Sequence, residues 1–264
     1  MKWQQFIKSY WELVNKNELM ALGGQVTYYL LLSFFPLLIF FFTLAGFAEL
    51  SSEKIFSELK YFLPAEALQI VENIVYEIFS THNPTLLSFG MLGAIWASTN
   101  GIRALLRGMK KAYGVAEKQG FIKLILSSLV VLFTISLTLI ITLLINLSGK
   151  SLSVIFSKMS FIVLFLFLVF AIVLFNRMAT NAQYPLNLIL PGSLFSSVGW
   201  LLLSLGFSLY FRHFNSYSLV YGSLGGIMIF LLWLYWSCEI LLLGCALNAV
   251  IIENYSLEKS KVAK

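Results

Sequence analysis

Six long apolar stretches constrain this chain more than any other feature of its sequence. A helix needs roughly 20 apolar residues to cross about 30 Å of hydrocarbon. A soluble protein built from several helices of this kind would have no polar face to present to water. The sequence therefore predicts an all-α, polytopic membrane protein with six transmembrane helices. The predicted spans cover residues 26–48, 86–106, 122–147, 159–176, 188–211 and 220–251.

The positions of Lys and Arg predict how these helices are threaded. Alternate segments, beginning with residues 1–25, hold thirteen of the 18 Lys and Arg residues, and the remaining segments hold five. Cytoplasmic loops are the ones that collect Lys and Arg. We therefore expect both the N- and the C-terminus in the cytoplasm. The net charge of +6 then indicates contact with anionic lipid headgroups at the cytoplasmic face.

Nucleic acid is not an expected partner. Binding to a single strand requires a basic groove with aromatic side chains on a water-exposed face. The basic residues of this chain lie instead at the ends of the predicted spans.

Three segments lie outside the predicted transmembrane domain, which covers residues 26–252. Residues 1–25 include an amphipathic stretch with lysines beside its apolar face, which is typical of a helix in the headgroup zone on the cytoplasmic side. Residues 49–85 contain apolar residues at helical spacing and predict an amphipathic, extracytoplasmic helical segment between the first two spans. That segment is either a lid over a cavity or a spacer. Residues 253–264 form a basic cytoplasmic tail.

The inventory of reactive side chains is small. All 12 acidic residues are Glu, and there are two His and two Cys. A catalytic Ser-His-Asp triad and a two-metal hydrolytic site both lack components in such a chain. We therefore expect no catalytic residues, no metal site and no cofactor.

Several polar residues fall inside or at the edges of the predicted spans. An ionisable side chain within a membrane is costly and usually faces a partner or a water-filled cavity. Glu239 is the clearest example, midway through the sixth span. We expect a polar cavity among the first, second and sixth spans that opens toward the cytoplasm. The candidate lining residues are Glu239, Arg103, Asn100, Gln25, Tyr28, Tyr235 and Asn248.

Arg103 and Glu239 carry the two alternatives for this cavity. They either pair across it or coordinate a charged headgroup or solute, or else they form a salt bridge that only holds helices together. Small residues at matching ends of the second and sixth spans predict close helix packing, and a proline in the first span frees a backbone carbonyl. These packing residues are Gly90, Gly93, Gly222, Gly225 and Pro36.

Several motifs resemble those of the BrkB/YihY-like membrane proteins. The first is Ala21–Pro36 (ALGGQVTYYLLLSFFP), followed by Trp96–Asn100 (WASTN) and Ala112–Glu117 (AYGVAE). The most specific is the pair YGSLGG and WLYWSCEILLLGCALN, which ends at Asn248. The resemblance covers residues 15–252 in order.

The resemblance implies a bacterial plasma-membrane protein with six spans, from a family that has carried both a ribonuclease and a virulence label. The ribonuclease label does not fit the reactive residues of this chain. The resemblance also suggests a transporter or lipid-translocating protein with a lipid or small solute as substrate. The alternative is a non-transporting membrane scaffold, or envelope-integrity protein, whose buried polar residues are structural.

Overall fold

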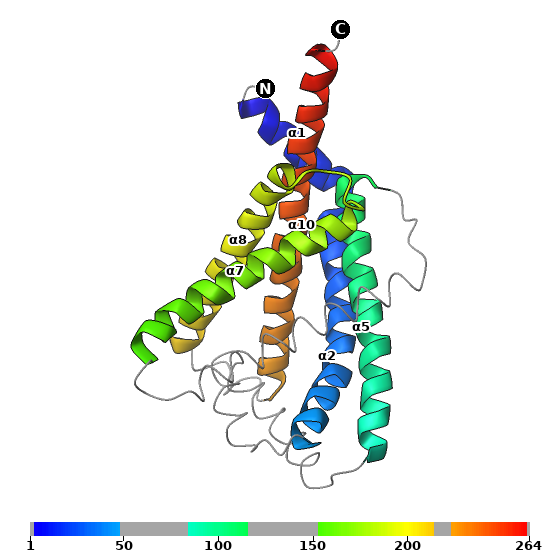
Figure 1. Ribbon diagram of the computed structural model, residues 1–264, viewed down its shortest axis with the longest axis vertical. Coiled ribbons are helices and arrows are strands. Elements are labelled where there is room, and N and C mark those ends of the chain that lie inside the picture. Colours follow the sequence, from blue (N-terminus) through cyan, green and yellow to red (C-terminus); the bar gives the residue numbers. More distant parts are fainter. Residues whose placement is uncertain (1–2, 48–83, 116–152, 214–222, 263–264) are drawn as a thin grey trace.

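The computed structural model describes residues 3–47, 84–115, 153–213 and 223–262. Within these ranges the chain is helical and contains no strand, which agrees with the all-α prediction. Figure 1 shows the helices as an elongated bundle. They are α1 (Trp3–Lys16), α2 (Leu19–Phe47), α5 (Pro84–Tyr113), α7 (Ser153–Ala179), α8 (Leu186–His213) and α10 (Ser223–Val262).

The long described helices run along the bundle in two opposite directions, as Figure 1 shows. Helix α2 leads away from the end of the bundle that carries both chain termini, and α5 returns to that end. Helix α7 starts at the opposite end and also runs toward the termini, α8 leads away again, and α10 returns. This order is compatible with six crossings. The predicted span 122–147 and the predicted external helix within 49–85 lie outside the described residues.

Two of the described helices are long and apolar enough to cross a membrane. These segments are Leu186–Tyr210 and Met228–Leu257, and shorter apolar segments occur at Leu19–Ser33 and Phe165–Ala179. Core helices of soluble proteins can be equally long and equally apolar. Here, however, the share of each long segment's most apolar window that is buried is only 33% and 39%, respectively. Large apolar side chains therefore face outward, as on a lipid-facing helix.

Helix α10 lies at the centre of the packing. It contacts α1, α2, α5 and α8, and the core is densest where α2, α5 and α10 meet. Val26 of α2, Met109 of α5 and Leu242 of α10 are almost completely buried there. A Cβ placed on Gly108 would lie 3.1 Å from Leu242 and 3.6 Å from Val26. The glycine therefore lets three helices approach one another closely.

The helix ends depart from the predicted spans mainly on the side of the termini. Helix α10 continues to Val262, so the tail that begins at residue 253 is largely helical. Helix α5 continues to Tyr113 and closes with Gly114 at φ +65°, where Val115 N donates to Lys110 O at 2.9 Å. This is the glycine-terminated helix end that a left-handed residue permits.

Helix α1 lies against the end of α10 on the side of the termini. Val14 is buried, whereas Trp3 and Trp11 are exposed. Tyr10 Oη donates a hydrogen bond of 3.3 Å to Leu243 O of α10. Burial raises the pKa of Tyr10 to about 12, so its phenol stays protonated at neutral pH. The amphipathic N-terminal stretch is therefore a helix anchored to α10.

Candidate functional site

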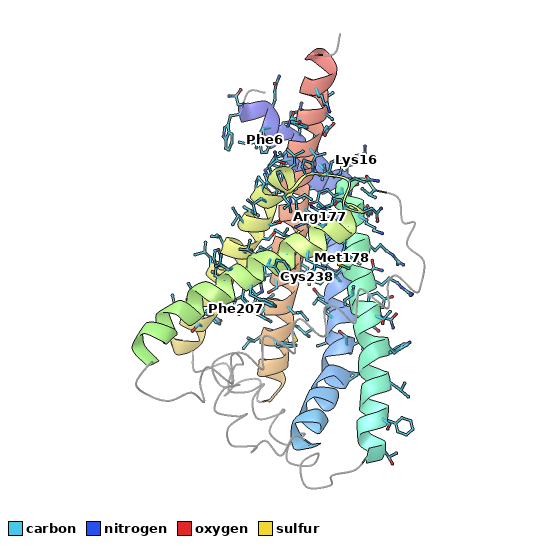
Figure 2. All side chains as sticks on the ribbon, in the orientation of Figure 1. Phe6, Lys16, Arg177, Met178, Phe207 and Cys238 are labelled. Atoms are coloured by element: carbon cyan, nitrogen blue, oxygen red, sulfur yellow. The ribbon has the colours of Figure 1, made fainter. Side chains whose placement is uncertain are left out.

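Glu239 is the most unusual side chain in the described part of the molecule. It lies on α10 and is 0% exposed, and neither of its carboxylate oxygens has a hydrogen-bond partner among the described residues. Nearly all buried polar groups in native proteins are hydrogen-bonded, so each exception needs an explanation. Figure 2 labels its neighbour Cys238, which lies partway along α10 inside the bundle.

The surface opposite Glu239 is the backbone of α2. A Cβ placed on Gly23 would overlap Oε1 of Glu239 and would lie 2.6 Å from its Cδ. Gly23 is therefore in direct contact with the carboxyl group. The Gly23 carbonyl oxygen accepts a hydrogen bond of 2.7 Å from Thr27 Oγ1, one turn further along α2. We call Gly23, Thr27, Tyr235, Cys238 and Glu239 the Glu239 contact.

Tyr235 and Arg103 are the predicted partners of this carboxyl. Tyr235 lies one turn before Glu239, and its hydroxyl is close enough to interact with the carboxyl. The pair does not meet the distance and angle of a hydrogen bond. Because α5 and α10 run in the same direction and Gly108 faces Leu242, Arg103 lies within about one turn of the level of Glu239. Arg103 is half-buried, and it does not hydrogen-bond to Glu239.

The remaining predicted lining residues lie in different surroundings. Gln25 and Tyr28 are exposed on the side of α2 turned away from Glu239, and Tyr28 retains 58% of its surface. Asn100 is half-buried on α5. The structure thus places Glu239 against Gly23 and Tyr235 against the adjacent Gly24. It places Gln25 and Tyr28 at exposed positions of the same helix.

Pro36 and Gly93, two of the predicted packing residues, face each other. A Cβ on Gly93 of α5 would lie 3.5 Å from Cβ of Pro36 in α2, which is ordinary contact. The surroundings of Gly90, Gly222 and Gly225 fall outside what the structure describes.

Asn248, the last predicted residue, belongs to a second and fully hydrogen-bonded cluster. Its Oδ1 accepts from Gly192 N at 2.6 Å, and its Nδ2 donates to Ile189 O at 2.8 Å and to Tyr113 Oη at 3.0 Å. The side chain thus bonds two backbone groups of α8, one on each side of Pro191.

Asn176 of α7 extends this cluster to a fourth helix. Its Oδ1 accepts from Tyr113 Oη at 2.6 Å and from Cys245 Sγ at 3.3 Å, and its Nδ2 donates to Ser193 Oγ at 3.0 Å. We call Tyr113, Asn176, Ser193, Cys245 and Asn248 the Asn248 layer. It ties α5, α7, α8 and α10 together by side-chain hydrogen bonds.

Glycines make this layer possible. A Cβ on Gly192 of α8 would overlap the carbonyl oxygen of Gly244 in α10 and would lie 2.5 Å from Asn248 Oδ1. A Cβ on Gly244 would overlap Ser196 Oγ and would lie 2.5 Å from the carbonyl oxygen of Gly192. The two helices therefore touch backbone to backbone at this level, as small residues allow.

Sequence reasoning did not identify Gly23, Gly192, Gly244, Tyr113 or Asn176 as site residues. Asn176 served only as the boundary of the fourth predicted span. A signal was available in α8, where Ser193, Ser196 and Ser197 recur at helical spacing and are all buried. The tight glycines carry no such signal, because apolarity does not reveal which helices pair.

The side chains of these two clusters can form hydrogen bonds and exchange protons. Within the described ranges no three His, Cys or Glu side chains come together in a group that could hold a metal ion. The only carboxyl at either cluster is that of Glu239, and both cysteines are free and buried.

Comparison with known proteins places these features in a family context. The model of the family described as Virulence factor BrkB matches residues 10–264. A Bacillus subtilis protein that carries the name ribonuclease-like protein YfkH is 31% identical over 96% of this chain and 97% of its own length. A UPF0761 membrane protein of Aggregatibacter aphrophilus is 24% identical over 96% of this chain and 94% of its own.

A more local similarity links the chain to a UPF0761 membrane protein of Pseudoalteromonas translucida. The two are 34% identical over 30% of this chain and 26% of the relative. No solved structure matches the chain.

Proposed function

Since the chain belongs to the Virulence factor BrkB family, whose relatives include proteins named as membrane proteins, we propose that it translocates a lipid or small solute across the bacterial plasma membrane. The observation that carries the proposal is the unpartnered carboxyl of Glu239, which is 0% exposed. An intramembrane ionisable residue of this kind marks a functional site by default. The proposed path passes Glu239 and Tyr235 between α2 and α10, with Asn100 and Arg103 on α5.

The contrast with Asn248 supports this assignment. If buried polar side chains in this protein served only to hold helices together, we would expect each to be satisfied, as Asn248 and Asn176 are. Glu239 instead lies against a glycine with no hydrogen-bond partner. A side chain that costs stability in the closed bundle is better explained by a second arrangement in which the carboxyl is solvated or bound.

The proposed topology has six spans with both termini in the cytoplasm. The shared end of the two termini in Figure 1 supports an even number of crossings. The excess of Lys and Arg in the segments on that side supports a cytoplasmic assignment.

We do not propose a ribonuclease activity, although one relative carries a ribonuclease-like name. The chain has no Asp and only two His, His82 and His213, far apart in sequence. Metal-dependent phosphodiester hydrolysis normally uses clustered carboxylates and histidines.

A flux assay tests the proposal directly. Purified protein is reconstituted into liposomes that contain fluorescent NBD-labelled phosphatidylglycerol, an anionic lipid, and dithionite bleaching measures how fast the label crosses the bilayer. We expect the parent protein to accelerate crossing and the E239Q variant to lose this acceleration. E253Q is the matched control, because Glu253 is an exposed carboxyl on the same helix. The assay is then repeated with a panel of small solutes. The proposal is contradicted if liposomes with the parent protein and empty liposomes show equal flux of the lipid and of every solute.

The second candidate function is a membrane scaffold, which the Asn248 layer favours. Four helices joined by a satisfied polar network form a rigid unit suited to holding partners in place. The two functions differ in what E239Q does to the protein. Translocation predicts normal abundance and thermal stability with lost flux, whereas a scaffold predicts a change in abundance or stability and no flux in any variant.

A further inference from the structure

We propose that Glu239 is a proton-binding site, and that its protonated form is the one that closes α2 against α10. This inference rests on the proposed translocation function and assigns the proton as the coupling ion. The geometry that supports it is the direct contact between the Glu239 carboxyl and the backbone of Gly23, with both carboxyl oxygens unpartnered and the side chain 0% exposed.

The space around the carboxyl selects among possible cations. A single added methyl group at Gly23 would already overlap Oε1. An organic ammonium group or a hydrated metal ion therefore does not fit on the α2 side of Glu239 in this arrangement. A dehydrated metal ion would need several oxygen ligands, and the nearby Gly23 carbonyl already accepts from Thr27. A proton occupies no additional volume.

The groups that face the carboxyl offer it no compensating charge. On α10 the neighbours are Tyr235 and Cys238, and on α2 Gly23 and Thr27 carry no charge. On α8, Ser196 and Gly199 pack against Ile240, the residue after Glu239.

The cations of α5 do not neutralise the carboxyl in this arrangement either. Arg103 lies within about one turn of its level, and Lys110 is buried further along the same helix. Neither donates a hydrogen bond to Glu239. An isolated buried carboxylate is strongly unfavourable, whereas the neutral acid is tolerated.

Proton release is therefore linked to separation of α2 from α10. When the carboxyl gives its proton to water, the resulting carboxylate requires water or a cation beside it. The Gly23 contact excludes both, so the ionised form favours an arrangement in which the two helices part and Arg103 or solvent reaches Glu239. Rebinding of a proton restores the contact. This is a two-state element that a proton gradient can bias.

Infrared spectroscopy of the parent protein in lipid nanodiscs tests protonation. At pH 7, water-exposed Glu carboxyls are ionised, because their pKa is about 4.3, and they contribute no carboxylic-acid C=O band. We expect such a band at pH 7 in the parent protein and in E253Q, and its loss in E239Q. If E239Q does not accumulate, carboxyl-¹³C glutamate in the parent identifies the band by its isotope shift. Absence of any Glu carboxylic-acid band at pH 7 overturns the proposal.

The two native cysteines report the helix separation. Cys238 lies next to Glu239 at the α2 interface, whereas Cys245 lies seven residues on, in the Asn248 layer, and both are buried. The C245S variant leaves only Cys238 for alkylation, and the C238S variant leaves only Cys245. The open state of a two-state protein is commonly populated at about 0.1 to 10% when it is the minor state. Cys238 is alkylated only when that state forms, so a shift to a mainly open state raises its alkylation rate by about tenfold or more.

We expect the alkylation rate of Cys238 to rise over the same pH range in which the carboxylic-acid band disappears. This rise should exceed the rise in the C245S/E239Q double variant, which corrects for ionisation of the thiol itself. Cys245 should show no comparable change. Equal pH dependence of Cys238 alkylation with and without Glu239 overturns the linkage.

The flux assay separates this inference from the proposed function. If E239Q loses flux but the parent shows no carboxylic-acid band, the translocation proposal is supported and the proton-binding proposal is rejected. A band and a pH-dependent Cys238 rate without flux in any assay leave the proton switch standing and remove translocation.

Discussion

Two polar clusters on the same helix differ in almost every respect. Glu239 and Asn248 are nine residues apart on α10, a rise of about 14 Å, and both are 0% exposed. Asn248 makes three hydrogen bonds to α5 and α8, whereas Glu239 makes none to the described residues. The polar groups of the Asn248 layer join helices by hydrogen bonds, whereas the carboxyl of Glu239 has no hydrogen-bond partner among the described residues. The comparison separates a part of the bundle whose polar groups are satisfied from the part that we propose to change.

Gly192→Ala should produce the largest effect, because the new methyl group would overlap backbone that cannot move alone. Overpacking and a broken Asn248 hydrogen bond together should destabilise the protein by about 3 kcal/mol or more. Thermal unfolding in detergent measures the change. Gly206→Ala is the matched control on α8, because nothing lies within 4 Å of the added Cβ. A thermal midpoint for Gly192→Ala equal to that of the control would show that the helices are not in contact at this level.

Asn248→Ala should destabilise the protein by about 2 to 3 kcal/mol, since it leaves Gly192 N–H and Tyr113 Oη with fewer partners. Combined with Tyr113→Phe it should show a coupling energy of about 1 kcal/mol, because the two side chains share one hydrogen bond. A double-mutant cycle on thermal or denaturant unfolding measures the coupling. Strictly additive effects would argue that the layer is not a connected network.

Gly23→Ala should cost less than Gly192→Ala, about 1 to 2 kcal/mol. The atoms it meets are the end of a flexible side chain, which can shift, rather than backbone. Its cost should fall further in an Glu239→Ala background, where the new methyl group enters space that the carboxyl has left. Unfolding of the four variants measures this dependence. The same cost in both backgrounds would place Glu239 away from Gly23.

Tyr10→Phe should have the smallest effect, about 1 kcal/mol, because it removes one hydrogen bond between α1 and α10. The contribution of the buried phenol should be constant below pH 10 and decline as pH rises from 10 toward about 12, because the folded-state pKa is raised from 10.0 to about 12. The pH dependence of unfolding in this range should therefore be weaker in Tyr10→Phe. An unchanged pH profile would contradict the docking of α1 through this residue.

The helices themselves were predictable from the sequence, and their contacts were not. Apolar runs located the bodies of α2, α5, α7, α8 and α10 because the hydrocarbon core demands them. The apolar runs did not predict the start of α2 at Leu19 or the end of α10 at Val262. A helix can continue beyond the hydrocarbon, where its side chains no longer need to be apolar.

The candidate site was predictable in part for the same reason. Glu239 stood out because a charge within an apolar run is rare. Its contact with Gly23 did not, because that depends on how α2 crosses α10. The expected direct pairing with Arg103 is not formed as a hydrogen bond. Asn248 was predicted to line the cavity, and the structure places it in a hydrogen-bonded network that sequence alone could not assemble.

The length of α10 gives the Asn248 layer a mechanical meaning. This helix of 40 residues contains no proline, unlike α2 and α8, so it is expected to tilt as one rod. The layer then acts as its fulcrum. Glu239 lies about 14 Å along one arm and Val262 about 21 Å along the other. If α10 tilts about the layer, a small displacement at the carboxyl produces a displacement about one and a half times as large at the C-terminal end of the helix. On the proposal made above, a change at Glu239 would therefore be transmitted along this one helix to its C-terminal end.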